Sequence, residues 1–303
     1  MKRRDFIQKT AAGSALVMSG LSLSSFAEAP EAKKLTILHT NDVHSHIDPF
    51  PVDDPKFPDK GGVARRASLI EKVRTEERNV LLLDAGDIFQ GTPYFNYYGG
   101  ELEMKLMSMM KYDLGTMGNH DFDNGIDGFY KQLPHAKFDF VSANYDFKNT
   151  VLDGIVKPYK IFEKDGLKIG IFGLGVELQG LVDKKLSKET KYLNPIEISQ
   201  DMSRILKVEQ KCDVVICLSH LGFIYDNEPQ KVSDLVLGRT TKNIDLIIGG
   251  HTHTFLKKPY IQKNLEGKEV MINQVGCYGV NVGRIDLTFE NGKVTGNGRT
   301  LIV

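Results

Sequence analysis

The chain has 303 residues, of which 41% are hydrophobic and 26% charged, and its 39 basic residues balance 39 acidic ones. This length suits one large domain or two small ones, and the near-average composition excludes a low-complexity or disordered chain. With no net positive charge and no dense Lys/Arg run, the sequence disfavours a nucleic-acid polymer as partner.

Residues 1–29 predict an export signal peptide. Three basic residues, Lys2 to Arg4, precede an apolar stretch over residues 11–26, and Ala27-Glu28-Ala29 offers a cleavage site before Pro30. The run Arg3-Arg4-Asp5-Phe6-Ile7 resembles a twin-arginine signal, although the general export route stays open. The stretch is short and rich in Ser and Gly, which disfavours a stable membrane span, so the predicted location is the periplasm.

The body of the chain alternates predicted strands with predicted helices. Eight apolar, β-branched runs predict strands at Leu35–His39, Asn79–Asp84, Phe138–Ala143, Lys168–Leu174, Asp213–Ser219, Ile244–Gly249, Val270–Val275 and Val282–Phe289. Apolar residues three and four apart predict helices at Gly62–Arg78, Glu101–Lys111 and Ile196–Lys211. This alternation predicts an α/β fold with two or more layers.

Three further segments have no such periodicity. Ile47–Gly61 and Lys148–Lys160 are predicted as surface insertions, and the residues after Phe289 as a polar tail. No linker divides residues 30–303, which are therefore predicted to form a single domain.

Polar residues follow the apolar runs at five strand ends. They are Asp42 and His44, Asp87, Asn119 and His120, His220, and finally His251 and His253. Loops beyond the carboxyl ends of strands share one edge of an α/β sheet, so these residues are expected to meet. The nitrogen and oxygen ligands suit Zn, Mn, Fe, Co or Ni. In extended backbone, the D-x-H and H-x-H spacings would point both ligands to the same side.

The joint pattern carries this prediction, because a lone His or Asp after a strand commonly has a structural role. Six of the eight histidines follow or close an apolar run. With Asp42 and Asp87 as the two carboxylates, a two-metal site would keep surplus positive charge and attract a phosphate dianion. The three cysteines show no C-x-x-C spacing and predict no disulfide framework, and Cys217 reads as a buried thiol.

The motifs resemble those of a known family. Leu35–His44 resembles the first signature of the 5′-nucleotidases, and Gly118–Asp123 resembles the second. The order D-x-H, G-D, G-N-H, H and G-H-x-H resembles that of the calcineurin-like metallophosphoesterases, from about Lys33 to Phe289. This resemblance implies a four-layer α-β-β-α sandwich and a catalytic domain over residues 30–303. One departure is Asp121, where the nucleotidase pattern has Glu.

The resemblance also implies residue roles. One divalent metal ion would be held by Asp42, His44, Asp87 and His253. A second would be held by Asp87, Asn119, His220 and His251, with Asp87 bridging. His120 and Asp123 would be the catalytic pair. Gln90 and His46 are candidates for orienting the site, His39 and His135 are interpreted as structural, and no substrate-binding residue can be named.

The function implied is hydrolysis of a small phosphate ester, foremost a 5′-nucleotide to nucleoside and phosphate, by metal-activated water. The alternatives within the family are 2′,3′-cyclic nucleotides, UDP-sugars and protein-bound thiosulfate. A non-catalytic metal-binding subunit is disfavoured because every motif position is occupied. Full-length 5′-nucleotidases add a C-terminal nucleotide-binding domain, which is expected to be absent here. The chain is therefore expected to act alone or with a separately encoded domain of that kind.

Overall fold

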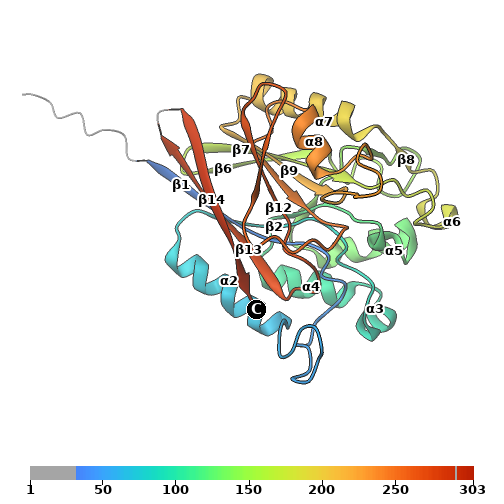
Figure 1. Ribbon diagram of the computed structural model, residues 1–303. Coiled ribbons are helices and arrows are strands. Elements are labelled where there is room, and N and C mark those ends of the chain that lie inside the picture. The colour runs from blue at the N-terminus through green and yellow to red at the C-terminus, as the bar shows by residue number, and fades with distance from the viewer. Residues whose placement is uncertain (1–31, 291) are drawn as a thin grey trace, which may run out of the picture. The chain divides into compact units, whose positions relative to one another are not determined.

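The computed structural model describes residues 32–290 and 292–303, and Lys33–Val303 form one compact unit (Figure 1). The predicted signal peptide lies outside the described residues. Within residues 32–290 and 292–303, no helix is long and apolar enough to cross a membrane.

The first sheet has six strands in the order β14-β13-β1-β2-β3-β4. Its strands are β1 (Lys33–Thr40), β2 (Val80–Asp84), β3 (Leu114–Gly115), β4 (Asp139–Phe140), β13 (Asn281–Glu290) and β14 (Lys293–Ile302). The first four run parallel, whereas β13 pairs antiparallel with β1 and β14 pairs antiparallel with β13.

The second sheet also has six strands, in the order β11-β12-β10-β9-β7-β6. Its strands are β6 (Tyr159–Lys164), β7 (Leu167–Gly175), β9 (Val214–His220), β10 (Leu246–Gly249), β11 (Tyr260–Lys263) and β12 (Glu269–Asn273). The four inner strands are parallel, and the two edge strands are antiparallel to their neighbours. A small separate sheet pairs β5 (Tyr145–Asp146) with β8 (Lys191–Tyr192).

Helices cover the outer face of each sheet (Figure 1). The helices are α2 (Val63–Glu76), α3 (Pro93–Tyr98), α4 (Glu101–Met109), α5 (Gly125–Gln132), α6 (Lys184–Ser187), α7 (Pro195–Arg204) and α8 (Asp234–Thr240). Apolar residues of α2, α4 and α5 pack on the first sheet, and those of α7 and α8 pack on the second. Helix α7 begins where Asn194 Oδ1 accepts a hydrogen bond from the Ile196 N–H at 3.0 Å.

A central core lies between the two sheets, so the layers are helix, sheet, sheet and helix. Successive residues of β2 alternate between cores: Leu81 and Leu83 face the second sheet, whereas Val80 and Leu82 face the helices. This alternation follows from the two-residue period of a strand, and it explains why residues 80–83 are all apolar. The predicted four-layer α/β fold is confirmed.

Each predicted strand and helix is present, with two changes in extent. The strand predicted at Phe138–Ala143 shortens to the two residues of β4. The helix predicted at Ile196–Lys211 leaves the α form after Arg204 and continues as a π turn over Ile205–Glu209.

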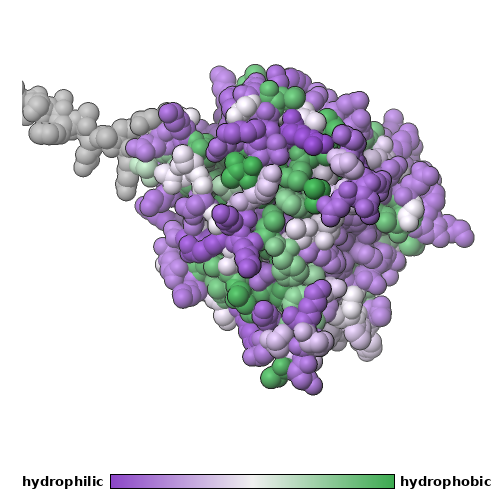
Figure 2. All heavy atoms as spheres, viewed as in Figure 1, coloured by the Kyte–Doolittle hydropathy of each residue, from purple (hydrophilic) through white to green (hydrophobic). Residues whose placement is uncertain are grey.

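Two segments differ from their predictions. The expected polar tail is wrong, because Lys293–Ile302 form β14, which pairs with β13 from Glu290↔Lys293 to Asn281↔Ile302. Hydrophilic residues are interspersed with hydrophobic ones over the face shown in Figure 2. An edge strand with one exposed face lacks the apolar run that marks a buried strand. The stretch Lys148–Lys160 is more than a surface insertion, because Leu152 and Val156 are buried in the core beneath the first sheet.

Candidate metal centre

All seven predicted metal ligands lie at the carboxyl edges of the two sheets. The first sheet contributes Asp42 and His44 after β1, Asp87 after β2 and Asn119 after β3, and the second contributes His220 at the end of β9 and His251 and His253 after β10. Six of these side chains form two groups in which the candidate ligand atoms lie within 4.8 Å of one another. The groups are Asp42 with His44 and His253, and Asp87 with His220 and His251.

The first group brings its two imidazoles and its carboxylate to a common point. His44 Nε2 lies 3.0 Å from His253 Nε2, and His253 Nε2 lies 3.3 Å from Asp42 Oδ1. The two Nε2 atoms and the carboxylate oxygen therefore face a common point, as the ligands of a metal ion do.

The second group is centred on Asp87. Its Oδ2 lies 3.0 Å from His220 Nε2 and 3.8 Å from His44 Nε2, so this carboxylate stands between the two groups. Asn119 joins the second group through its Oδ1, which lies 2.9 Å from His251 Nδ1. The position of Asp87 is the one that a bridging ligand requires.

Hydrogen bonds on the far side of two rings set which nitrogen faces the centre. His44 Nδ1 donates to the Gln90 carbonyl at 3.1 Å, and His220 Nδ1 donates to the Ala85 carbonyl at 2.7 Å. Because Nδ1 carries the proton in that arrangement, Nε2 offers its lone pair to the group. Among the described residues, the buried His220 Nε2 has no aligned hydrogen-bond partner, although Asp87 is close.

The electrostatics of both groups favour a positive charge. Burial disfavours a charged ring at His220, but Asp87 outweighs burial and raises the pKa of His220 to about 10. Burial opposes charge at His253 too, and Asp42 raises the pKa of that ring to about 10. A proton or a divalent cation satisfies a buried carboxylate in this way, so the residues present fit a pair of divalent metals.

The backbone of the ligand loops is left-handed, and the expectation of an extended conformation is therefore wrong. The φ angle is 50° at both Asp42 and His44, 56° at Asp87, 74° at His251 and 51° at His253. Non-glycine residues rarely adopt these angles, and such strain concentrates at functional sites. Asp42 and His44 still converge on the first group, whereas His253 joins that group and His251 joins the second.

Close packing of loops leaves no room for larger residues. A Cβ at Gly118 would lie 2.2 Å from Asp87 Oδ1, and one at Gly250 would lie 2.7 Å from His220 Nδ1. Glycine at these two positions lets backbone approach the ligands directly.

The buried carboxylate of Asp121 ties two of the loops together. It accepts hydrogen bonds from the backbone N–H groups of Asp87 at 3.0 Å, Ile88 at 3.0 Å and Gly118 at 2.8 Å. From the sequence, Asp121 stood out only as a departure from the nucleotidase pattern. Its position directly after Gly118-Asn119-His120 was the signal that an acidic side chain lies in the same turn as the predicted ligand Asn119.

His120 and Asp123 form the predicted pair. His120 Nδ1 lies 2.9 Å from Asp123 Oδ2, and the His120 backbone N–H donates to Asp87 Oδ1 at 2.8 Å. The hydrogen bond that His120 Nδ1 donates to Asp123 holds the pKa of His120 above its ordinary value. The His120 side chain is 38% exposed, so it is accessible to a substrate at the metal groups.

His39 and His135 lie apart from the ligand groups, whereas Cys277 lies beside His253. His39 is fully buried beside Asn273, and His135 lies 3.9 Å from the Glu101 carboxylate. The three cysteines are buried and free. Gln90 contributes its backbone carbonyl to the site, and its side chain is exposed.

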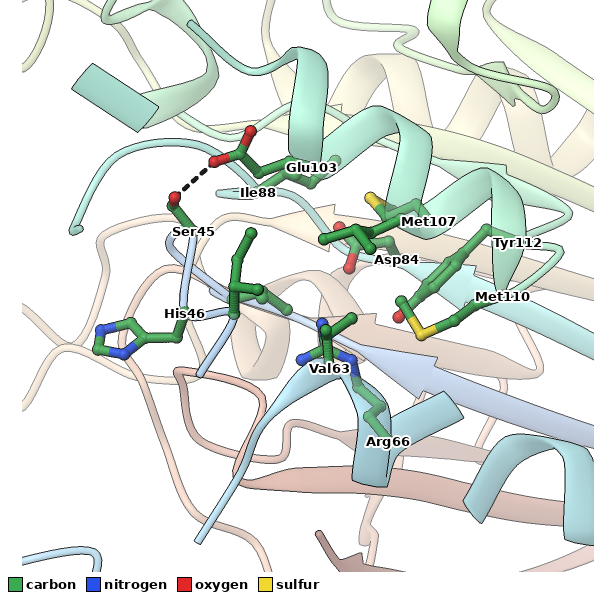
Figure 3. Close-up of a pocket in the computed structure, with 13 residues that line it drawn as sticks. Ser45, His46, Val63, Arg66, Asp84, Ile88, Glu103, Met107, Met110 and Tyr112 are labelled. Carbon is green, nitrogen blue, oxygen red and sulfur yellow. Dashed lines mark hydrogen bonds between the residues drawn. The ribbon is translucent and has the colours of Figure 1, made fainter. Parts of the chain in front are cut away.

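A small cavity lies under the loop that follows β1 (Figure 3). Its volume is about 20 Å³, which is the space of about one water molecule. Ser45, next to His44, donates to Glu103 of α4 at 2.5 Å at the cavity wall. Arg66 of α2 also lines the cavity and is buried. Sequence reasoning missed Arg66 and Glu103, because charged residues on amphipathic helices are usually solvent-exposed.

The profile of the calcineurin-like phosphoesterases matches residues 35–255, which is more than half of the chain. The chain belongs to this family.

Individual relatives are 5′-nucleotidases and related phosphoesterases. The snake venom 5′-nucleotidase of Naja atra is 35% identical over 291 aligned residues, which cover 86% of this chain and 51% of the venom protein. The crystal structure of a 5′-nucleotidase precursor from Thermus thermophilus matches with a TM-score of 0.81 at 33% identity, covering 89% of this chain and 55% of that one. The crystal structure of the calcineurin-like phosphoesterase YfkN from Bacillus subtilis matches with a TM-score of 0.70 at 27% identity, covering 89% of this chain and 91% of that one. The chain spans about half the length of the curated nucleotidases it matches.

Proposed function

We propose that the chain hydrolyses phosphomonoesters, with 5′-nucleotides as the substrate class, and releases inorganic phosphate. The observation that carries this proposal is the pair of His and Asp groups with Asp87 between them and His120 beside them. The similarity to the 5′-nucleotidases of Naja atra and Thermus thermophilus supports the choice of substrate class.

In this proposal one divalent cation would be held by Asp42, His44, His253 and Asp87, and a second by Asp87, Asn119, His220 and His251, with Asp87 shared between them. The chemistry that two bound divalent cations supply is activation of water and neutralisation of charge on the phosphoryl group. The donor set suits Zn, Mn, Co, Fe or Ni, and elemental analysis of the purified protein would identify the metal.

His120 is the proposed proton donor. Asp123 orients its ring through Nδ1 and favours the charged form, so Nε2 carries a proton toward the substrate side. The backbone of His120 is held by Asp87, which keeps the imidazole at a fixed position relative to the metal groups. Protonation of the leaving oxygen by such a group contributes about 10²–10⁴-fold to the rate.

The test is phosphate release from AMP and p-nitrophenyl phosphate with added Mn²⁺ or Zn²⁺, with and without a chelator. We expect metal-dependent turnover, and we expect His120→Asn to lower kcat by about 10²–10⁴-fold. The control His135→Asn alters a histidine beside Glu101 and keeps the wild-type rate. No phosphate release from either ester at saturating metal would contradict the proposal. Assays with 2′,3′-cyclic AMP and UDP-glucose separate a monoesterase from a diesterase.

We also propose export to the periplasm, which is supported by the Arg3-Arg4 pair and the apolar stretch that follows it. Cell fractionation with an Arg3→Lys, Arg4→Lys variant would show precursor retained in the cytoplasm if the twin-arginine route is used, and unchanged export would refute that route. The separately encoded nucleotide-binding domain stays a prediction. A chain of that kind would lower the KM for AMP more than the KM for p-nitrophenyl phosphate.

A further inference from the structure

A group of five aromatic rings lies beside the first ligand group. We call it the aromatic face, and it consists of His46, Phe50, Phe57, Phe255 and Tyr278. Tyr278 is its centre, with ring centroids 4.3 Å from His46, 5.9 Å from Phe50 and 6.1 Å from Phe57. The rings come from the loop after β1, the loop after β10 and the loop before β13.

The aromatic face touches the candidate metal ligands through Tyr278. The Tyr278 ring centroid lies 5.9 Å from that of His44 and 5.8 Å from that of His253. Its backbone N–H also donates to the Asp42 carbonyl at 2.7 Å. Tyr278 therefore contacts all three residues of the first group, and its ring adjoins the place where a phosphate ester would bind.

The backbone of Tyr278 indicates that the ring has a use there. Its φ is 62°, in the left-handed region that a bulky side chain rarely adopts, between Gly276 at 86° and Gly279 at 63°. A glycine would take this conformation without strain. Strained bulky residues persist where their surroundings hold them and concentrate at ligand sites.

The aromatic face is open to solvent at its outer end. Phe255 is 43% exposed, and it stacks on the buried Phe57, with ring centroids 5.8 Å apart and an interplanar angle of 30°. Tyr278, His46 and Phe50 are half-buried, so each keeps some accessible ring surface. Phe57 serves packing, because it anchors the Ile47–Gly61 loop. The other rings keep accessible aromatic surface, and the Tyr278 ring lies next to His44 and His253.

We infer that the aromatic face, with Tyr278 at its centre, binds the planar aromatic ring of the substrate's leaving group, such as a nucleobase. This inference rests on the proposed phosphomonoesterase function and names a substrate subsite within this chain. Nucleobases stack on aromatic side chains because every base presents a π-face. A leaving group without such a ring gains nothing from the aromatic face.

The experiment compares AMP with ribose 5-phosphate, which shares the phosphate and the ribose but lacks the base. The measured quantity is the ratio of kcat/KM for AMP to that for ribose 5-phosphate, because a ratio cancels any general change at the metal groups. We expect Tyr278→Gly to lower this ratio about 5- to 150-fold, which corresponds to a stacking contribution of about 1–3 kcal/mol. Glycine accepts the φ of this position, so the variant should fold.

Two further variants sharpen the comparison. Tyr278→Phe keeps the ring and should keep the wild-type ratio. Tyr97→Ala is the matched control, since Tyr97 is 82% exposed and lies on α3 outside the aromatic face. An unchanged ratio in Tyr278→Gly, or an equal loss in Tyr278→Phe, would overturn the inference while leaving the phosphomonoesterase function intact.

A binding measurement separates the two proposals. Adenosine binding to the wild-type protein and to Tyr278→Gly is compared by calorimetry or saturation-transfer NMR, which requires no turnover. If adenosine binds to the wild type and binding is lost in Tyr278→Gly, the aromatic face is supported even where no ester is hydrolysed. Equal adenosine binding by both proteins would overturn it.

Discussion

Single buried residues decide how the ligand loops are held. Asp121 accepts four backbone hydrogen bonds from the loops after β2 and β3. A buried N–H without a partner costs about 1–3 kcal/mol, so this one carboxylate secures the conformation of both loops. Its pKa is raised to about 7 by burial and by the nearby charge of Asp87. The same loops supply Asp87 and Asn119, whose positions therefore depend on a residue that contacts no substrate.

His39 predicts how the stability of the protein depends on pH. Burial lowers the pKa of this fully buried ring to about 3, below its ordinary 6.5. The folded ring therefore stays neutral, and as pH falls below 6.5 the unfolded chain binds a proton that the folded chain does not. The stability from this group is present above pH 6.5 and is lost toward pH 3. Between pH 7.5 and 5 the expected loss is about 2 kcal/mol.

Urea unfolding of wild type and His39→Gln, both in chelator, measures this contribution. The glutamine can still accept the hydrogen bond that Asn273 makes to His39 Nε2 at 2.9 Å, but it does not titrate. The other histidines titrate in both proteins, so the difference between their pH profiles belongs to His39. If the free energy of unfolding of both proteins changed equally with pH, the pKa of His39 would be the same in the folded and the unfolded chain.

At the scale of elements, strand β14 closes one edge of the first sheet. Its residues pair with β13 over the whole length of both strands, and β13 carries the buried Val282, Ile285 and Leu287. An unpaired β13 would expose a row of backbone groups and favour association between chains.

Truncation after Gly292 tests the role of β14. We expect a loss of more than about 2 kcal/mol, which corresponds to a fall in Tm of more than about 4 °C, with increased aggregation. Lys293→Ser is the control, because it changes one exposed side chain and keeps the strand. A Tm equal to that of the full chain would mean that these residues behave as the tail expected from the sequence.

For the whole molecule, the candidate metal centre joins the two sheets, because its ligands come from strands of both. Divalent metal should therefore stabilise the entire fold. At a free metal concentration 100 times the Kd, one site contributes about 2.7 kcal/mol, so Tm should rise by more than about 5 °C.

Calorimetry with Mn²⁺ or Zn²⁺ and with chelator measures this rise. In Asp87→Asn the rise should be largely lost, because Asp87 stands between both ligand groups. Asp53→Asn alters an exposed carboxylate in the Ile47–Gly61 loop and should keep it. An equal rise in Asp87→Asn would show that the metal stabilises the protein from another place.

Much of the fold and of the site was predictable from local patterns. Strands β2 and β9 are apolar up to their last one or two residues, because they are covered on both faces, and that composition is visible without a structure. The edge strand β14 was not predictable, because its exposed face removes the apolar run. Arg66 and Glu103 were missed for a related reason, since nothing local distinguishes a buried charge on a helix from an exposed one.

The sequence by itself determined which residues could form a metal centre, because each ligand follows a buried strand and the carboxyl ends of parallel strands meet at one edge. Only the tertiary structure decided how they meet. His44 and His253 come within 3.0 Å although 209 positions separate them, and neither the left-handed loops nor the position of Tyr278 beside both rings follows from spacing. The physical reason is that strand patterns encode burial, which is local, whereas the approach of two loops depends on the packing of both sheets.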